Sequence, residues 1–312
     1  MNSESDSSDL IAGLPHIHEK NLLLMYQTLL TSIHSIVTAL PGSSTDSVWA
    51  YLENRKAHKT YVRQDLLPLL VYVAISKQSY KAAIPLAACW TLQLAAAHLL
   101  DSAQDNGRTQ DVNAGIAALG IANVALVQLS ADHDTMCDIL DAFGRVTVLG
   151  ANAQDSERGR IIRTRAAYCQ TVAGKAATII SAGVWSGGRL ASNDPAVLSI
   201  LKEFGLAWGM ATQISDDCLD LEEDLGNGLF TLPMIEALSN TNHPDHPLLE
   251  TLSRKTFLQV SEVQTIANIL REMGTIDACR RMTRAYQVQA AAAFSILPEL
   301  EPFFRDYITP EF

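Results

Sequence analysis

The chain has 312 residues, of which 48% are hydrophobic and 18% charged, so it can bury one large core. Its formal net charge of −11 argues against a nucleic-acid partner, because phosphate binding needs clustered Lys and Arg. The five cysteines are far apart, odd in number and without a CxxC pair, which excludes a disulfide framework and a zinc site as expectations. These features predict a globular protein in a reducing, cytoplasmic setting.

The N-terminal segment is polar and acidic and lacks the apolar stretch of a secretory signal. We therefore expect residues 1–18 to be a disordered lead-in and residues 19–312 to form one domain. The apolar runs at 66–75 and 84–100 are shorter than the roughly 18–20 residues of a membrane span, or are interrupted by polar groups. No membrane span is expected.

Apolar residues recur at helical spacing along most of the chain, and the alternation typical of strands is never sustained. In chain order, the predicted helices cover 21–40, 66–80, 83–105, 112–129, 132–152, 156–186, 194–224, 231–238 and 259–297, with a break near Gly274 in the last. No linker or fixed-period repeat divides them. The sequence predicts an all-α protein, a single-domain helical bundle.

The stretch HLLDSAQDNGR (98–108) ends an apolar helix with two aspartates, Asp101 and Asp105, one helical turn apart. Two like charges at this spacing destabilise an isolated helix by roughly 0.2–0.5 kcal/mol. One such pair is more often a solvated helix end than a site. A bound cation is the functional interpretation.

A second acidic cluster, TQISDDCLDLEED (212–224), closes another long apolar helix. Asp216, Asp220 and Asp224 recur at every fourth position, and Asp217 stands beside them. Carboxylate oxygens suit Mg²⁺ or Mn²⁺, and magnesium fills its remaining positions with water and substrate phosphate oxygens. Two such helix ends together predict a phosphorylated substrate held through metal ions.

Lys175 is a lone cation in an apolar helix, within QTVAGKAATIISAG (170–183). Its ammonium group can reach the same phosphate. A surface lysine that lays its aliphatic stem along the protein explains the pattern equally well. Both interpretations stay open at this point.

With these motifs the chain resembles the trans-isoprenyl diphosphate synthase (polyprenyl synthetase) family of the class I terpenoid synthase superfamily. GMATQISDDCLD (209–220) is similar to the family's G-x-x-F-Q-x-x-D-D-x-x-D, with Thr212 in place of Phe. DLGNGLFTLPMIEAL (224–238) is similar to D-L-x-x-G-K-x-T-L-P-x-I-x-A-L, with Leu229 in place of Lys. The resemblance implies a helical bundle around a deep central cavity, with the two acidic motifs facing each other at its mouth.

The chain departs from the family pattern in its first acidic motif and in two groups of cations, and these cations are the groups with which the family binds isopentenyl diphosphate, the acceptor in chain elongation. The first motif, D-D-x-x-D, lacks its second aspartate between Asp101 and Asp105, and Gln110 and Asp111 replace a pair of arginines. The family's G-G-K-R-x-R-P-L-L appears as YVRQDLLPLL, with only Arg63 near the expected cations. The groups that serve the allylic diphosphate remain. The resemblance therefore implies an enzyme that ionises an allylic prenyl diphosphate, and we expect a terpene synthase or cyclase.

The resemblance also implies a set of site residues. The expected catalytic residues are Asp101, Asp105, Asp216, Asp220 and Lys175. The expected metal ligands are these four aspartates together with Asp217 and Asp224. The expected substrate-binding residues are Lys175, Gln213, Ala96, Ala97 and Arg63. Three Mg²⁺ ions, with Mn²⁺ as the alternative metal, are expected to bind together with the substrate diphosphate. The alanines imply a deep cavity for a C15 or C20 chain or longer, and the family implies a homodimer.

Three alternatives remain beside the cyclase. The first is a chain-elongating polyprenyl diphosphate synthase of the geranylgeranyl type, in which Arg63, Arg108 or the arginines at 158–165 replace the missing cations. The second is prenyl transfer to a non-isoprenoid acceptor such as a peptide side chain. The third is an inactive partner subunit of a hetero-oligomeric synthase.

Overall fold

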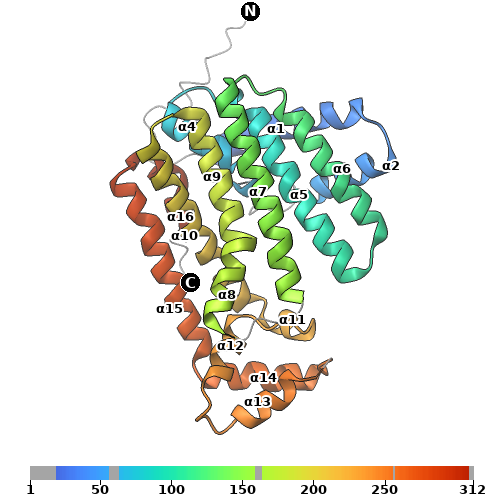
Figure 1. Ribbon diagram of the computed structural model, residues 1–312, viewed down its shortest axis with the longest axis vertical. Coiled ribbons are helices and arrows are strands. Elements are labelled where there is room, and N and C mark those ends of the chain that lie inside the picture. Colours follow the sequence, from blue (N-terminus) through green and yellow to red (C-terminus); the bar gives the residue numbers. More distant parts are fainter. Residues whose placement is uncertain (1–18, 56–62, 159–163, 256, 309–312) are drawn as a thin grey trace, which may run out of the picture. The chain divides into compact units, whose positions relative to one another are not determined.

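The structure, a computed structural model, describes residues 19–55, 63–158, 164–255 and 257–308, without the side chains of residues 105, 106, 157 and 158. Within these residues all secondary structure is helical (Figure 1), which confirms the predicted all-α class. The predicted disordered lead-in, residues 1–18, lies outside the described residues.

The contacts of the chain divide it into two compact units. Unit 1 comprises Met1–Ile139, Gly183–Ser199 and Leu297–Asp306, and unit 2 comprises Leu140–Ala182, Ile200–Ile296 and Tyr307–Phe312. The sequence shows no linker between the units, because most of their boundaries fall inside helices: α7 (His133–Arg158), α9 (Thr178–Ala191), α10 (Pro195–Leu219) and α16 (Glu301–Ile308). That residues 19–312 form one domain stays a prediction. A boundary inside a regular helix leaves no change of composition to detect.

Unit 1 is built around the apolar helix α5. Its elements are α1 (Glu19–Ala39), α2 (Ser43–Arg55), α4 (Leu67–Ser76), η1 (Tyr80–Ala83), α5 (Ile84–Asn106), α6 (Thr109–Leu126), the start of α7 (His133–Arg158), the end of α9 (Thr178–Ala191), the start of α10 (Pro195–Leu219), η4 (Pro298–Leu300) and most of α16 (Glu301–Ile308). Helix α6 lies against α5 so closely that a Cβ atom on Gly115 would stand 2.6 Å from the Leu100 side chain. The sequence did not predict helix α2, because a helix with only two buried aliphatic residues, Val48 and Leu52, shows little apolar periodicity.

Unit 2 holds the second acidic cluster. Its elements are the rest of α7, α8 (Arg165–Val172), the π-helical turn η2 (Ala173–Ala177), the start of α9, most of α10, α11 (Leu221–Gly226), α12 (Leu232–Ser239), α13 (His246–Ser253), α14 (Val260–Glu272), α15 (Thr275–Ala291) and η3 (Ala292–Ser295). The predicted break at Gly274 is confirmed, and this glycine has a φ of 68°. The predicted helix 194–224 ends at Leu219, before α11. Helix α13 was not predicted.

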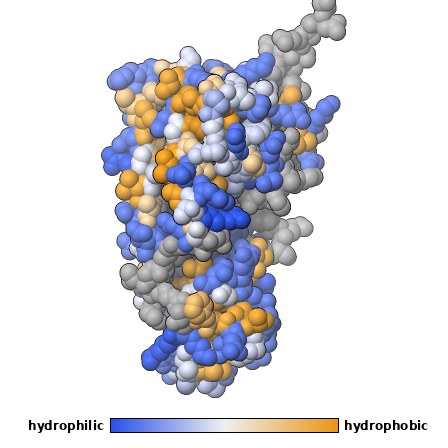
Figure 2. Space-filling model, turned by 90° about the vertical axis from the view of Figure 1, so that its right-hand side faces the viewer, coloured by the Kyte–Doolittle hydropathy of each residue, from blue (hydrophilic) through white to orange (hydrophobic). Residues whose placement is uncertain are grey.

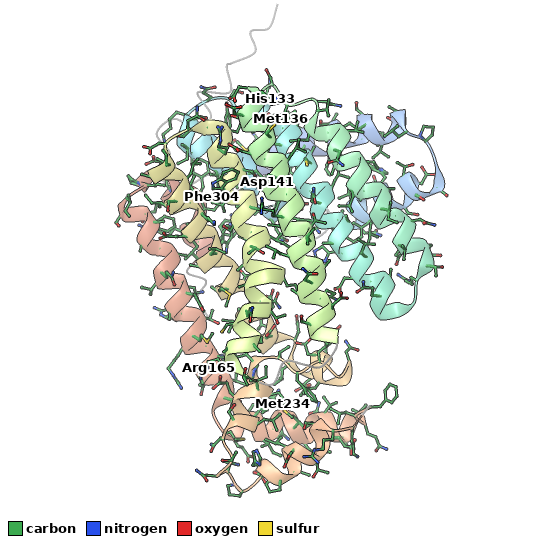
Figure 3. All side chains as sticks on the ribbon, viewed as in Figure 1. His133, Met136, Asp141, Arg165, Met234 and Phe304 are labelled. Atoms are coloured by element: carbon green, nitrogen blue, oxygen red, sulfur yellow. The ribbon has the colours of Figure 1, made fainter. Side chains whose placement is uncertain are left out.

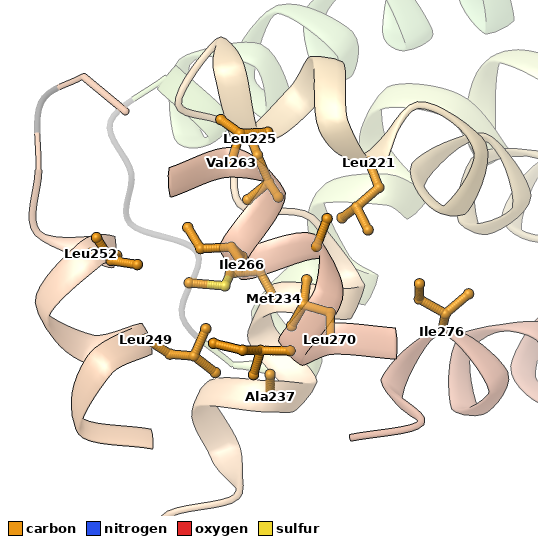
Figure 4. Close-up of a cluster of buried hydrophobic side chains, with 12 residues drawn as sticks. Leu221, Leu225, Met234, Ala237, Leu249, Leu252, Val263, Ile266, Leu270 and Ile276 are labelled. Atoms are coloured by element: carbon orange, nitrogen blue, oxygen red, sulfur yellow. The ribbon is translucent and has the colours of Figure 1, made fainter. Parts of the chain in front are cut away.

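A hydrophobic cluster joins the short helices of unit 2 (Figure 4). The labelled side chains come from α11 (Leu221, Leu225), α12 (Met234, Ala237), α13 (Leu249, Leu252), α14 (Val263, Ile266, Leu270) and α15 (Ile276). Burial of a side chain such as leucine stabilises a protein by about 1.5–3 kcal/mol. The cluster therefore fixes the end of α11 and the start of α12, and with them the connecting segment 227–231.

Two glycines let α10 approach the chain of α9 and η2 at backbone distance. A Cβ atom on Gly205 would lie 2.5 Å from the Cα of Ser181, and one on Gly209 would lie 2.5 Å from the Cα of Ala177. Real Cβ atoms do not come this close, so only glycine fits. The paired positions run in opposite directions along the chain, which makes the two segments antiparallel.

Two described helical stretches, Glu19–Ala39 and Tyr80–Gln104, are long and apolar enough to cross a membrane by length and composition alone. The sequence-based prediction was too strict here, because it counted only the uninterrupted apolar runs. Within the most apolar window of each stretch, 44% and 72% of the residues are buried inside the protein. Core helices pass the same test, so the two stretches are weak evidence for a membrane.

The close approach predicts the effect of two glycine substitutions. Gly209→Ala should lower the free energy of unfolding by about 1–3 kcal/mol, because the new methyl group overlaps backbone atoms that cannot move aside. Gly144→Ala is the matched control on α7, where nothing lies within 4 Å of the new Cβ atom. There the better helix former should raise stability by up to about 1 kcal/mol. Urea denaturation measures both, and equal effects would contradict the packing argument.

Candidate active site

Unit 2 contains an open pocket at the end of α10. Its lining residues are Tyr168, Thr171, Val172, Lys175, Gln213, Asp217, Gly228, Leu229, Phe230 and Thr231. They come from α8, the π turn, α10 and the segment that connects α11 to α12. The pocket therefore joins Lys175 to the second acidic cluster, as the sequence predicts for a shared phosphate.

The glycine contacts explain why these residues meet. Gly205 and Gly209 set the antiparallel register of α10, and Gln213 and Asp217 follow at the same spacing of four residues. In this register they lie opposite the end of α8 and the start of the π turn. Lys175 is in the middle of that turn. π turns are frequent at functional sites.

Asp217 lines the pocket as a buried residue, and its carboxylate is hydrogen-bonded within the protein. Its side chain is 4% exposed, and both oxygens accept hydrogen bonds from the protein. The Tyr168 hydroxyl donates to Oδ2 at 2.5 Å, and Gln213 Nε2 donates to Oδ1 at 2.9 Å. Burial beside this carboxylate raises the pKa of Tyr168. Tyr168 thus stays protonated as a donor, and Gln213 holds Asp217.

Asp216 and Asp220 are exposed and are not among the residues that line the pocket, while Asp224 on α11 is half-buried. The surrounding protein still removes water from the Asp216 carboxylate, and this desolvation, with the charges of Asp220 and Asp217, raises its pKa to about 6. Asp220 is one turn further along the chain, where its amide donates to the Asp216 carbonyl at 2.8 Å. The exposed pair therefore carries an electrostatic cost that a cation would relieve.

The chemistry of this pair fits a magnesium ion. Mg²⁺ is usually bound through one or two carboxylates, with water and substrate phosphate oxygens completing its shell. Asp216 and Asp220 supply two such carboxylates, and a cation beside them would offset the desolvation and the like charges that raise the pKa of Asp216. Among the described side chains, no group of three or more His, Cys, Asp or Glu is close enough to hold a metal ion by itself.

The first acidic motif belongs to unit 1. Asp101 is half-buried near the end of α5, and the side chain of Asp105 lies outside the described residues. Ala96 is buried where α5 meets α6, with its carbonyl oxygen 3.4 Å from a Cβ atom built on Gly115, and Ala97 is exposed. The metal-binding role of the aspartates and the substrate contact of the alanines stay predictions.

Ser102 occupies the position of the missing second aspartate, and it contacts one of the residues that replace the arginine pair. Its hydroxyl donates to Asp111 at 3.4 Å, and Arg108 lies 3.8 Å from the same carboxylate. Arg108, proposed as a substitute cation, thus has an acidic neighbour. Arg165, labelled in Figure 3, is also engaged, since it donates two hydrogen bonds to Glu236 at 2.6 and 2.5 Å.

The segment that corresponds to the family's basic loop contains a buried carboxylate. Asp65 is fully buried and accepts hydrogen bonds from Arg55 at 2.9 Å and from Tyr26 at 3.3 Å. Burial raises the pKa of Asp65 to about 7 despite Arg55. Arg63 is half-buried, and burial lowers its pKa although the negative charges of Asp306 and Glu19 act to raise it. The carboxylate of this segment therefore pairs with other residues of unit 1.

The sequence missed several residues of the pocket. Tyr168 and Thr171 precede Lys175 on the same helical stretch by seven and four residues, and this helical spacing was the signal available. Thr231 belongs to the T-L-P segment that resembles the family motif, but nothing in the sequence assigns its hydroxyl a task.

The helical architecture matches solved structures over nearly the whole chain. The geranylgeranyl pyrophosphate synthetase from Pyrococcus horikoshii superposes with a TM-score of 0.78 and 18% sequence identity, covering 94% of this chain and 99% of that one. A polyprenyl synthase from Caulobacter crescentus, complexed with calcium and isoprenyl diphosphate, gives a TM-score of 0.73 and 20% identity over 97% and 98% of the two chains. The protein therefore has the isoprenoid synthase fold.

The sequence places the chain within this class. The family model for polyprenyl synthetase matches residues 96–270, more than half of the chain, and the protein belongs to this family. It is 27% identical over 176 residues to an all-trans-nonaprenyl-diphosphate synthase (geranyl-diphosphate specific) from Rhodobacter capsulatus. The match covers 52% of this chain and 50% of that relative, so the chain spans about half of the relative's length. The predicted family is confirmed.

The raised pKa of Asp216 predicts how its removal affects stability. Above about pH 6 the folded protein carries an ionised carboxylate that it disfavours, whereas an unfolded aspartate titrates near pH 3.9. Asp216→Asn should therefore raise the melting temperature at about pH 7.5 in metal-free buffer, and the gain should fade as the pH drops from about 6 towards 4. Glu223→Gln, on an exposed residue, gives the baseline for losing one charge. A gain independent of pH would contradict the prediction.

Proposed function

We propose that the protein is a Mg²⁺-dependent prenyltransferase that ionises an allylic prenyl diphosphate and elongates it with isopentenyl diphosphate. The observation that carries this proposal is the pocket that brings Lys175 to the second acidic motif, inside the segment matched by the polyprenyl synthetase model. The curated relative from Rhodobacter capsulatus is a nonaprenyl-diphosphate synthase, which favours the elongation alternative over the cyclase expected from the sequence.

In the proposed reaction the bond between the allylic carbon and its diphosphate oxygen breaks, and pyrophosphate leaves with the electron pair. The double bond of isopentenyl diphosphate forms the new carbon–carbon bond, and transfer of a proton from the resulting cation to the released pyrophosphate restores an alkene. Lys175 neutralises charge on the leaving pyrophosphate. Asp216 and Asp220 would hold magnesium, the role also proposed for Asp101 and Asp105. Bound magnesium supplies further neutralisation of the diphosphate.

The cyclase is the second candidate, and one observation favours it. Two segments that hold the acceptor in the family lack its cations and contain carboxylates that pair within the protein: Asp65 with Arg55, and Asp111 near Arg108. A carboxylate does not attract a second diphosphate. In the cyclase reaction the allylic cation would be captured by a double bond of its own prenyl chain or by water. The pocket of unit 2 would bind the allylic diphosphate in the same way as in elongation.

Homodimerisation is proposed through α6. Along this helix Val112, Ile116 and Val124 are 38%, 59% and 42% exposed, and exposed Gly120 fills the gap in the four-residue spacing. On the face drawn in Figure 2, hydrophobic residues lie in groups among hydrophilic ones. A continuous apolar stripe on one exposed helix face is typical of a helix that packs against a partner.

The products formed with and without isopentenyl diphosphate test the function. The purified protein is incubated with Mg²⁺ and geranyl, farnesyl or geranylgeranyl diphosphate, and diphosphates and hydrocarbons are separated. We expect longer prenyl diphosphates that appear only when isopentenyl diphosphate is present, and no turnover when EDTA removes the metal. Hydrocarbon or alcohol formed without isopentenyl diphosphate would establish the cyclase instead.

A lysine variant connects this activity to the pocket. Lys175→Met should lower kcat by about 100- to 1,000-fold, the usual effect of removing one group that stabilises developing negative charge. Lys202→Met is the matched control, because Lys202 is an exposed lysine outside the pocket lining. Equal activity of the two variants would remove Lys175 from the mechanism.

The α6 stripe predicts the oligomeric state. Ile116→Glu should convert a dimer to a monomer in sedimentation velocity, because it places a charge in an apolar contact. Val288→Glu is the control, since Val288 is an equally apolar, 66% exposed residue on a different helix, α15. A dimer that survives Ile116→Glu would exclude this face as the contact.

A further inference from the structure

The hydroxyl of Thr231 is buried in the pocket wall without a hydrogen-bond partner among the described residues. The residue is 8% exposed and lines the pocket, and its Oγ1 atom is closed off from solvent in the described structure. A buried hydroxyl without a partner is unfavourable, so proteins rarely keep one without a use.

The local fold explains why this hydroxyl is not used as a helix cap. Thr231 is the N-cap residue of α12, and a threonine there ordinarily accepts a hydrogen bond from the second or third amide of the helix. The second position is Pro233, which has no amide hydrogen. The third amide, of Met234, donates to the Thr231 carbonyl oxygen at 3.1 Å. The side chain is left for another partner.

The surroundings of Thr231 suit an anion. Lys175 and the hydroxyl-bearing Thr171 line the same pocket, and the start of α12, with its partial positive charge, follows directly. Asp217 also lines it, but both of its oxygens accept hydrogen bonds from Tyr168 and Gln213. Leu229, where the resemblance places a lysine, brings no charge to the pocket.

We propose that the Thr231 hydroxyl is a substrate-binding group that donates a hydrogen bond to an oxygen of the diphosphate. In this role it partly compensates for Leu229, which stands where the family pattern has a lysine. The inference rests on the proposed function, since it names a further binding residue for the same phosphorylated substrate. The bound diphosphate supplies the hydrogen-bond acceptor that the described residues do not.

Calorimetric titration with inorganic pyrophosphate at a fixed Mg²⁺ concentration tests this role. Thr231→Val keeps the shape of the side chain and removes the hydroxyl, and it should weaken pyrophosphate binding by about tenfold or more, the usual effect of losing a hydrogen bond to a charged group. Thr231→Ser keeps the hydroxyl and should bind within about twofold of the unmodified protein, a loss far below that of a hydrogen bond.

Thr283→Val is the matched control. Thr283 is 1% exposed on α15, and its hydroxyl also lacks a hydrogen-bond partner among the described residues, but it is outside the pocket lining. This variant should leave pyrophosphate affinity unchanged, and both valine variants should keep their melting temperature because each replaces an unsatisfied hydroxyl with a methyl group.

The outcomes separate this inference from the proposed function. Weaker binding in Thr231→Val alone, restored in Thr231→Ser, supports the role of the hydroxyl. Unchanged affinity in Thr231→Val, with chain elongation intact, overturns the inference and leaves the proposed function in place. A protein that neither binds pyrophosphate nor turns over any prenyl diphosphate overturns both.

Discussion

The close approach of α10 to the chain of α9 and the π turn is the constraint on which the site depends. Gly205 and Gly209 allow contact at backbone distance, and any side chain there would push the two segments apart. Because the register continues along α10, the same contact brings Asp217 to Tyr168 and closes the hydrogen bond between them. The pocket beside Lys175 is therefore a consequence of this helix packing.

Within the second acidic motif, the neighbouring aspartates Asp216 and Asp217 differ in burial and in hydrogen bonding. Asp217 is buried and its charge is met by two donors, so it contributes to the wall of the site. Asp216 carries a raised pKa because desolvation and the charge of Asp220 disfavour its ionised form. A cation bound beside Asp216 would offset this cost. The imbalance is typical of functional sites, where binding supplies the compensating charge.

The two units differ in how far they keep the pattern of the family. Unit 2 keeps Lys175 and, from the second acidic motif, Asp217 around one pocket. Unit 1 carries carboxylates in the segments where the family has cations, and these pair internally, as in Asp65 with Arg55. The similarity to a nonaprenyl-diphosphate synthase favours the proposed elongation, while the paired carboxylates favour the cyclase. The product assay decides between these two consequences.

The sequence by itself determined the helical class, most of the long helices, the break at Gly274 and the family, because periodicity and motif spacing are local properties of the chain. It could not separate Asp217 from Asp216, because burial and donors depend on which helix packs alongside. It also missed α2 and the unpartnered hydroxyl of Thr231, whose environment comes from residues distant in sequence. Only the tertiary structure decides these features, since only packing determines which polar groups lose water and which partners replace it.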